Sequence, residues 1–228
     1  MLSVMKTEEQ RRARELRAQG WSIKEIEHEL GVARSSVSLW VRHVPLGTEQ
    51  RQRLVERIRL GPVVAAELKA QRARDVRRTY QQEGRRLVRE RGAGYLAGCM
   101  LYWAEGAKAR NTAQLVNSDP ALLLCFVRFL QTEFGVLPEG MTLRCNLFAD
   151  HLGGQREIET WWLTRLGLPA SSLRKSHVNV YSKYSNKKRT NKLPYGTCTV
   201  TVHNTEIVQT IYGSIQEYGG FERPEWLD

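Results

Sequence analysis

The sequence lacks several patterns that would assign it to a familiar class. It has no run of about 18 apolar residues, so no membrane-spanning helix and no membrane partner are expected. Its opening residues, MLSVMKTEEQRR, lack the apolar core and cleavage site of a secretory signal. The motifs G-x-x-x-x-G-K-[ST], G-x-S-x-G and H-E-x-x-H are also absent. These absences favour a cytoplasmic protein, associated with the nucleoid if its partner is DNA.

Cysteine is scarce and scattered. No C-x-x-C pair occurs, so the spacing of a zinc site is missing. Most of the cysteines have apolar neighbours, and we interpret them as small buried side chains in a reducing compartment. We therefore expect no metal or other cofactor at the four cysteines, which are Cys99, Cys125, Cys145 and Cys198.

Acidic residues are outnumbered by basic ones. The sequence has 35 Lys and Arg against 24 Asp and Glu, which gives a net charge of +11. Such a balance favours a polyanionic partner, with nucleic acid first and an acidic membrane surface second. Charge that only keeps the protein soluble is the remaining alternative. The 41% hydrophobic and 26% charged content is typical of a soluble globular protein.

The chain divides into three parts by composition. Residues 1–47 are predicted to form a helical domain, 48–92 a basic helical linker, and 93–228 a domain of helices and strands. Gly61-Pro62 is expected to interrupt the linker, with one long helix starting at Pro62. The linker arginines either contact phosphates or form a solvated face.

Residues 7–43 carry the strongest local signals. Ser22 and Glu25 have the spacing of a capping box, which begins a helix, and Gly31 suits a left-handed turn residue. Ile26 and Leu30 then recur at helical spacing. A third helix follows, with Val37, Trp40 and Val41 on its inner side.

The pattern G-x-S-x-x-E-I-x-x-x-L-G-V-x-x-S-S-V-S-x-W-V resembles the helix-turn-helix of bacterial repressors, recombinases and transposase-like proteins, in bacteria or phages. The resemblance implies that the third helix enters the major groove of DNA with its early residues at base edges. Arginine commonly contacts guanine, whereas serine is less selective. A three-helix protein-interaction module is the alternative. The implied DNA-binding residues are Arg34, Ser35, Ser36, Ser38 and Arg42.

Residues 93–228 predict an α+β domain with one antiparallel sheet and helices on one face. Helices are expected at 93–110, 120–134, 155–167 and 205–218. Strands are expected at 112–119, 141–150, 175–183 and 196–204. We expect Asp119 to cap the helix at 120–134, and Asn204 or Thr205 to cap the helix at 205–218.

The segment GCMLYWAEG, from Gly98 to Gly106, resembles a degenerate LAGLIDADG motif of homing endonucleases. Leu101 and Ala104 match the family letters, as does Gly106, and Glu105 replaces the final aspartate. The resemblance implies a homodimer through the Gly98–Gly106 helix, a sheet that lies on DNA, and Glu105 as the ligand of a divalent metal such as Mg²⁺ if the protein is a nuclease. A helix-terminal surface carboxylate is the alternative interpretation of Glu105.

The motif also departs from that family. Tyr102 and Trp103 are bulkier than the usual residues, and the stretch from Gly106 to Asp119 is short for a DNA-reading hairpin. A similar degenerate domain, joined to a helix-turn-helix in the reverse order, occurs in the WhiA-type sporulation regulators, which resemble nucleases but act as transcription factors. This comparison favours regulation over cleavage.

The segment SKYSNKKRTNKLPYG carries charge of one sign, interleaved with tyrosine and asparagine. Such a composition suits contact with DNA phosphates, and a solvated surface loop is the alternative. Its basic residues are Lys183, Lys187, Lys188, Arg189 and Lys192.

Together these features predict a sequence-specific double-stranded DNA-binding protein, a transcriptional regulator that contacts DNA with both domains. The alternative is a metal-dependent, site-specific endonuclease of the homing type. An accessory factor for recombination or phage immunity is a third hypothesis. No cofactor is expected for a regulator.

Overall fold

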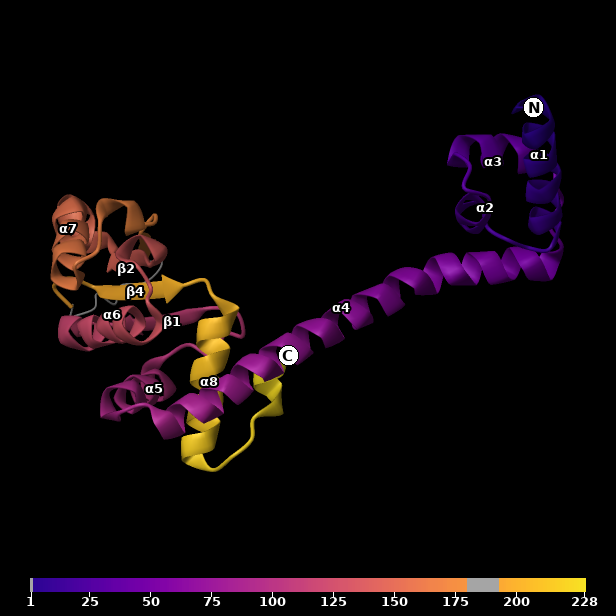
Figure 1. The fold of residues 1–228 in the computed structure, drawn as a ribbon. Coiled ribbons are helices and arrows are strands. Elements are labelled where there is room, and N and C mark those ends of the chain that lie inside the picture. Colours follow the sequence, from indigo (N-terminus) through magenta and orange to yellow (C-terminus); the bar gives the residue numbers. More distant parts are fainter. Residues whose placement is uncertain (1, 180–192) are drawn as a thin grey trace. The chain divides into compact units, whose positions relative to one another are not determined.

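The computed structural model describes residues 2–179 and 193–228 and shows a mixed α+β chain, as predicted (Figure 1). The chain forms two compact units, Met1–Gln71 and Arg72–Asp228. One helix, α4 (Thr48–Glu90), contributes residues to both units. The three-part division at 47/48 and 92/93 therefore stays a prediction. Among the described residues, no helix is long and apolar enough to cross a membrane.

Three short helices begin the first unit: α1 (Leu2–Ala18), α2 (Ile23–Leu30) and α3 (Arg34–Val41). The predicted capping box is present, because Ser22 Oγ accepts from the Glu25 N–H at 3.2 Å and Glu25 Oε2 accepts from the Ser22 N–H at 2.8 Å. Gly31 ends α2 at φ 63°, in the left-handed region that favours glycine. These helices are consistent with the predicted helix-turn-helix, and they enclose a small core of Ala13, Leu16, Ile26, Val37 and Val41.

The predicted interruption at Gly61-Pro62 is wrong, because α4 continues through Pro62. Proline fits a helical φ, but it removes one backbone hydrogen bond and costs about 3 kcal/mol in a helix interior. The surrounding Arg, Leu, Ala and Glu residues are strong helix formers, and they favour a continuous helix on both sides of the proline.

After the last turns of α4, the second unit continues with α5 (Ala93–Glu105), β1 (Ala113–Asn117), α6 (Pro120–Phe134), β2 (Thr142–Phe148), α7 (Gln155–Leu166), β3 (His177–Asn179), β4 (Thr197–Val202) and α8 (Thr205–Gly219). Short 3-10 helices lie at Pro138–Gly140, Ala149–Gly154, Ala170–Ser172 and Pro224–Leu227. The predicted caps are present: Asp119 caps α6, and Asn204 rather than Thr205 caps α8.

The sheet has the strand order β1-β4-β2-β3 and is mixed, which corrects the prediction of a purely antiparallel sheet. The strand β4 pairs antiparallel with both β1 and β2, whereas β3 runs parallel to β2. The chain passes through α7 between β2 and β3, and such a helical crossover returns the next strand in the same direction. The parallel register begins at Asn146 opposite His177.

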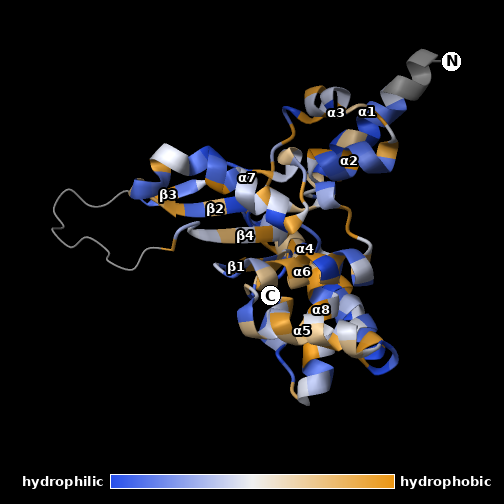
Figure 2. Ribbon diagram, turned by 90° about the vertical axis from the view of Figure 1, so that its left-hand side faces the viewer, coloured by the Kyte–Doolittle hydropathy of each residue, from blue (hydrophilic) through white to orange (hydrophobic). Residues whose placement is uncertain are grey.

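One face of the sheet is buried against the helices. Alternate strand residues such as Leu115, Leu143, Cys145 and Val200 join the main core, and α5, α6 and α8 lie together beside β1 (Figures 1 and 2). The predicted burial of the cysteines is confirmed for Cys99, Cys145 and Cys198, whereas Cys125 is exposed on α6.

The last turns of α4 cross α8 at very short range. A Cβ atom at Gly84 would lie 1.9 Å from the Thr210 carbonyl oxygen, and one at Gly213 would lie 1.9 Å from the Gln81 carbonyl oxygen. Beside this crossing, the buried Gln81 side chain donates to Gln209 Oε1 at 2.7 Å and accepts from Gln216 Nε2 at 3.0 Å. Only glycine permits this approach of two backbones.

We expect Gly84→Ala to lower the free energy of unfolding by about 3 kcal/mol, because the added methyl group meets backbone atoms that cannot move aside. Gly94→Ala on α5 is the matched control. No atom lies within 4 Å of its added Cβ, so the variant should gain roughly 0.5 kcal/mol from helix propensity. Urea unfolding followed by far-UV circular dichroism measures both. Equal effects at the two sites would contradict the close crossing.

Candidate nucleic-acid interface

The outer side of α3 is a solvent-exposed polar surface. Val37 and Val41 are buried on the inner side, whereas Arg34, Ser35 and Ser38 are exposed. Ser36 is half-buried at the edge of the helix. The predicted residue Arg42 is exposed immediately after the last turn, at the C-cap. The structure therefore brings the predicted residues to one short helix and leaves most of them accessible.

Two arginines of α1 hydrogen-bond to backbone carbonyls, one in α3 and one just before α2. Arg14 Nε donates to the Trp40 carbonyl at 3.1 Å, and Arg17 Nη1 donates to the Trp21 carbonyl at 2.8 Å. At the other end, Ala33 occupies the N-cap without a side-chain hydrogen bond. The first backbone N–H groups of α3 therefore receive no side-chain acceptor from the N-cap residue.

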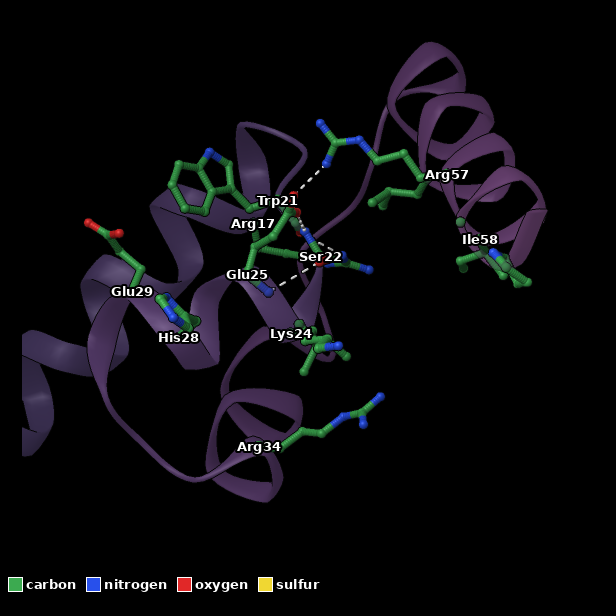
Figure 3. A pocket seen from close by; sticks show the side chains of 14 residues that line it. Arg17, Trp21, Ser22, Lys24, Glu25, His28, Glu29, Arg34, Arg57 and Ile58 are labelled. Carbon is green, nitrogen blue, oxygen red and sulfur yellow. Dashed lines mark hydrogen bonds and ion pairs between the residues drawn. The ribbon is translucent and has the colours of Figure 1, made fainter. Parts of the chain in front are cut away.

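A groove of about 850 Å³ lies between α2 and the first turns of α4 within the first unit. Figure 3 shows Lys24 and Arg34 on one side of it and Ile58 on the other. Arg57 forms an ion pair with Glu25 at 2.5 Å. The Ser22 backbone N–H, and then Ser22 Oγ and Arg57, hold the pKa of the Glu25 carboxyl below its usual range. Lys24 and Arg34 thus supply two basic side chains beside the start of α3.

Leu39 was not predicted as a site residue, although its side chain is 59% exposed in the middle of the outer side of α3. It follows Ser35 by one helical turn, so the same helical spacing that placed Ser35 outside also places Leu39 there. An apolar side chain on a DNA-facing helix can contact a thymine methyl group.

The second unit presents a polar sheet face opposite its core. Gln114 on β1, Arg144 and Asn146 on β2, and Thr199 on β4 line a groove of about 540 Å³. Asn146 Nδ2 donates to Thr199 Oγ1 at 2.9 Å, which holds the two neighbouring strands' side chains together. The further residues that line the groove are Val116, Thr142, Arg174, Thr197, Thr201 and His203.

This sheet face was also missed as a set of site residues, although the sequence contains its signal. Polar and apolar residues alternate in TLRCNLF and TCTVTV, and alternate residues of a strand point to opposite sides. The alternation predicts which residues leave the core, but it does not show that Arg174 joins them from outside the strands. The predicted basic residues Lys183, Lys187, Lys188, Arg189 and Lys192 lie outside the described residues.

Glu105, the predicted metal ligand, is exposed at the last residue of α5. Its Oε2 atom accepts from Asn117 Nδ2 at 3.3 Å, which connects the end of α5 to the end of β1. Among the residues that the structure describes, no group of three or more His, Cys, Asp or Glu side chains could hold a metal ion.

The end of α5 is held by Lys108. Its ammonium group donates to the carbonyls of Trp103 at 2.9 Å and Gly106 at 2.6 Å, and burial lowers the pKa of this lysine.

The motif glycines contact their own chain. A Cβ atom at Gly98 would lie 2.0 Å from the Phe129 ring, and one at Gly106 would lie 2.5 Å from the Tyr102 ring. The homodimer predicted through this helix stays a prediction.

Comparison with known proteins gives one partial match. A family described as "Putative ATPase subunit of terminase (gpP-like)" matches residues 8–44, which contain α2, α3 and most of α1. No curated protein and no solved structure matches the chain. The match therefore includes the whole of the α3 surface and ends before α4.

We expect Ala33→Ser to stabilise the first unit by roughly 1 kcal/mol, because Ala33 already occupies the N-cap with a non-helical backbone (φ −59°, ψ 138°) and lacks only a side-chain acceptor. Ser22→Ala should destabilise the same unit by about 1 kcal/mol through loss of the existing cap. Hydrogen exchange of α2 and α3 amides measures both. Changes of the same sign would contradict this assignment of the two caps.

Proposed function

We propose that this protein binds double-stranded DNA sequence-specifically, with α3 in the major groove. The observation that carries the proposal is the outer side of α3, where four polar side chains are exposed: Arg34, Ser35, Ser38 and Arg42. The inner side of the same helix packs in the small core. A single helix fits the major groove, which is about 12 Å wide. Arginine can donate two hydrogen bonds to guanine, and the serines can donate to or accept from either base pair.

The polar sheet face of the second unit is our proposed second contact. Arg144 and Arg174 supply charge, and Gln114 on β1 and Asn146 on β2 supply polar side chains, whereas Thr199 on β4 between them is buried. This composition suits phosphate and sugar oxygens, which receive half or more of protein–DNA hydrogen bonds. The net charge of +11 supports the same partner. The LAGLIDADG resemblance implies this use of a sheet and remains part of the proposal.

Within DNA binding, we infer a regulatory role rather than cleavage. Glu105 is engaged with Asn117, and no observation in the described residues favours the nuclease alternative over binding alone. The terminase description belongs to the family that matches residues 8–44. We take from it support for the first unit only, and we assign no ATPase activity to this chain.

Substitution of the α3 arginines tests the first contact. A duplex selected from a random pool should bind Arg34→Ala or Arg42→Ala more weakly than the wild type, by about 1–3 kcal/mol for each arginine that hydrogen-bonds to a base. Arg128→Ala, at an exposed position of α6 on the core side of the sheet, is the control and should bind normally. Electrophoretic mobility shifts give the affinities. Normal binding by both α3 variants would exclude this helix as the reading surface.

Salt dependence tests the second contact. Arg144→Ala should weaken specific and random duplexes about equally and should lower the slope of log K against log salt by about 1, as expected when one phosphate is no longer neutralised. Fluorescence anisotropy over a salt series measures the slope. An unchanged slope would show that the sheet face does not neutralise phosphates.

Regulation and cleavage are separated by incubating the selected duplex with protein in Mg²⁺ or in EDTA. We expect intact DNA in both and the same result for Glu105→Gln. Mg²⁺-dependent cleavage at the selected site, abolished in Glu105→Gln, would establish the nuclease alternative instead.

A further inference from the structure

In the first unit, α4 presents an apolar face that the other described residues of that unit leave open. Leu60, Val64 and Leu68 follow one another at intervals of one helical turn, and their side chains are 49%, 53% and 55% exposed. Gly61 and Ala65 lie beside them, and the five residues line one shallow groove on the helix with Arg53, Glu56 and Arg57. A surface helix usually turns its apolar stripe towards a core, so this stripe lacks its cover.

The sequence of this segment also carries very little charge for a solvent-exposed helix. From Leu60 to Leu68 the sequence LGPVVAAEL contains one charged residue, Glu67. The groove along this face also shares Arg57 and Gly61 with the larger groove between α2 and α4, which is lined by Trp21 and Ile58. A helix laid along the face would therefore also cover the mouth of that second groove.

We propose that a second copy of this chain covers the face, with the two α4 segments antiparallel about Val64. In this register Val64 lies opposite Val64 of the second copy, and Leu60 lies opposite Leu68 of the second copy. The same surface is then used by both molecules, as a twofold dimer requires. The small residues Gly61 and Ala65 allow the helices to approach closely.

Charge selects the antiparallel direction. A parallel pair would place Arg57 beside Arg57 and Glu67 beside Glu67, together with the like charges of the two Arg53 side chains. The antiparallel pair places Gln71 of the second copy opposite Arg57, with Glu67 of the second copy one helical turn away. Opposite charges thus become neighbours, and the cluster of arginines at the start of α4 is separated from its counterpart.

The pairing goes beyond the proposed function and is tested without DNA. In analytical ultracentrifugation of the full chain at about 1–100 µM, the wild type should sediment as a dimer, and Val64→Glu should raise the dimer dissociation constant at least about tenfold. Val55→Glu is the matched control. Val55 is 65% exposed and lies nine residues from Val64, which is about two and a half turns and so the opposite side of the helix.

Two outcomes of that experiment overturn the proposal. They are a wild type that stays monomeric over the whole range and a dimer that Val64→Glu leaves as tight as Val55→Glu does. Both variants replace exposed side chains, so circular dichroism should show an unchanged fold. Either outcome leaves the DNA-binding proposal standing, because that proposal is tested by the α3 variants.

Disulfide crosslinking tests the direction. In a Cys125→Ser background, which removes the exposed native thiol, a mixture of Leu60→Cys and Leu68→Cys should form crosslinked heterodimers. Leu60→Cys alone should not crosslink, because an antiparallel pair separates its two copies by about eight residues, roughly 12 Å along the helix, beyond the reach of a disulfide. Efficient crosslinking of Leu60→Cys with itself would overturn the antiparallel register.

Discussion

Val37 and Val41 on α3, and the alternating apolar residues of β2 and β4, are fully buried in their two cores. This one-sided burial determines which side chains remain for a partner. The orientation of α3 depends on the turn at Gly31, whose left-handed backbone lets the chain reverse within a few residues of the end of α2. The sheet depends on the period of two along its strands. Both candidate surfaces therefore lie on the sides of these elements that face away from the two cores.

Glycines have different roles at the crossing of α4 and α8, on α5, and on the apolar face of α4. Gly84 and Gly213 bring α4 and α8 into backbone contact within the second unit, and Gly98 makes room for the Phe129 ring. Gly61, by contrast, meets no atom within 4 Å of an added Cβ. The first three glycines are explained by contacts inside the chain, whereas Gly61 lies on the apolar face of α4 that we propose as an interface between copies.

Much of the first unit could be predicted from the sequence because its signals are local. The Ser22–Glu25 cap, the turn at Gly31 and the inner residues of α3 are separated by only a few positions. In the second unit the helix bounds of α6 and its Asp119 cap could be predicted in the same way. The predicted DNA-binding residues on α3 were mostly exposed for the same reason, since helical spacing fixes their side of the helix.

The remaining features depend on contacts between distant parts of the sequence. The parallel pairing of β3 with β2 follows from the path of α7, and the contact of Gly84 with Thr210 joins residues far apart in the chain. Arg174 reaches the sheet face from outside any strand. The continuity of α4 through Pro62 depends on local sequence, but the proline predicted a break in the helix. The helix-forming residues on either side of Pro62 outweighed the effect of the proline.

The central claim is that α3 reads bases in the major groove, and methylation interference on a selected duplex tests it most directly. Dimethyl sulfate methylates guanine at N7 in the major groove and adenine at N3 in the minor groove, so one reaction probes both grooves. The account predicts that N7 methylation of guanines within the site blocks binding. Binding that tolerates every N7 methylation and is blocked only by adenine N3 methylation would contradict it.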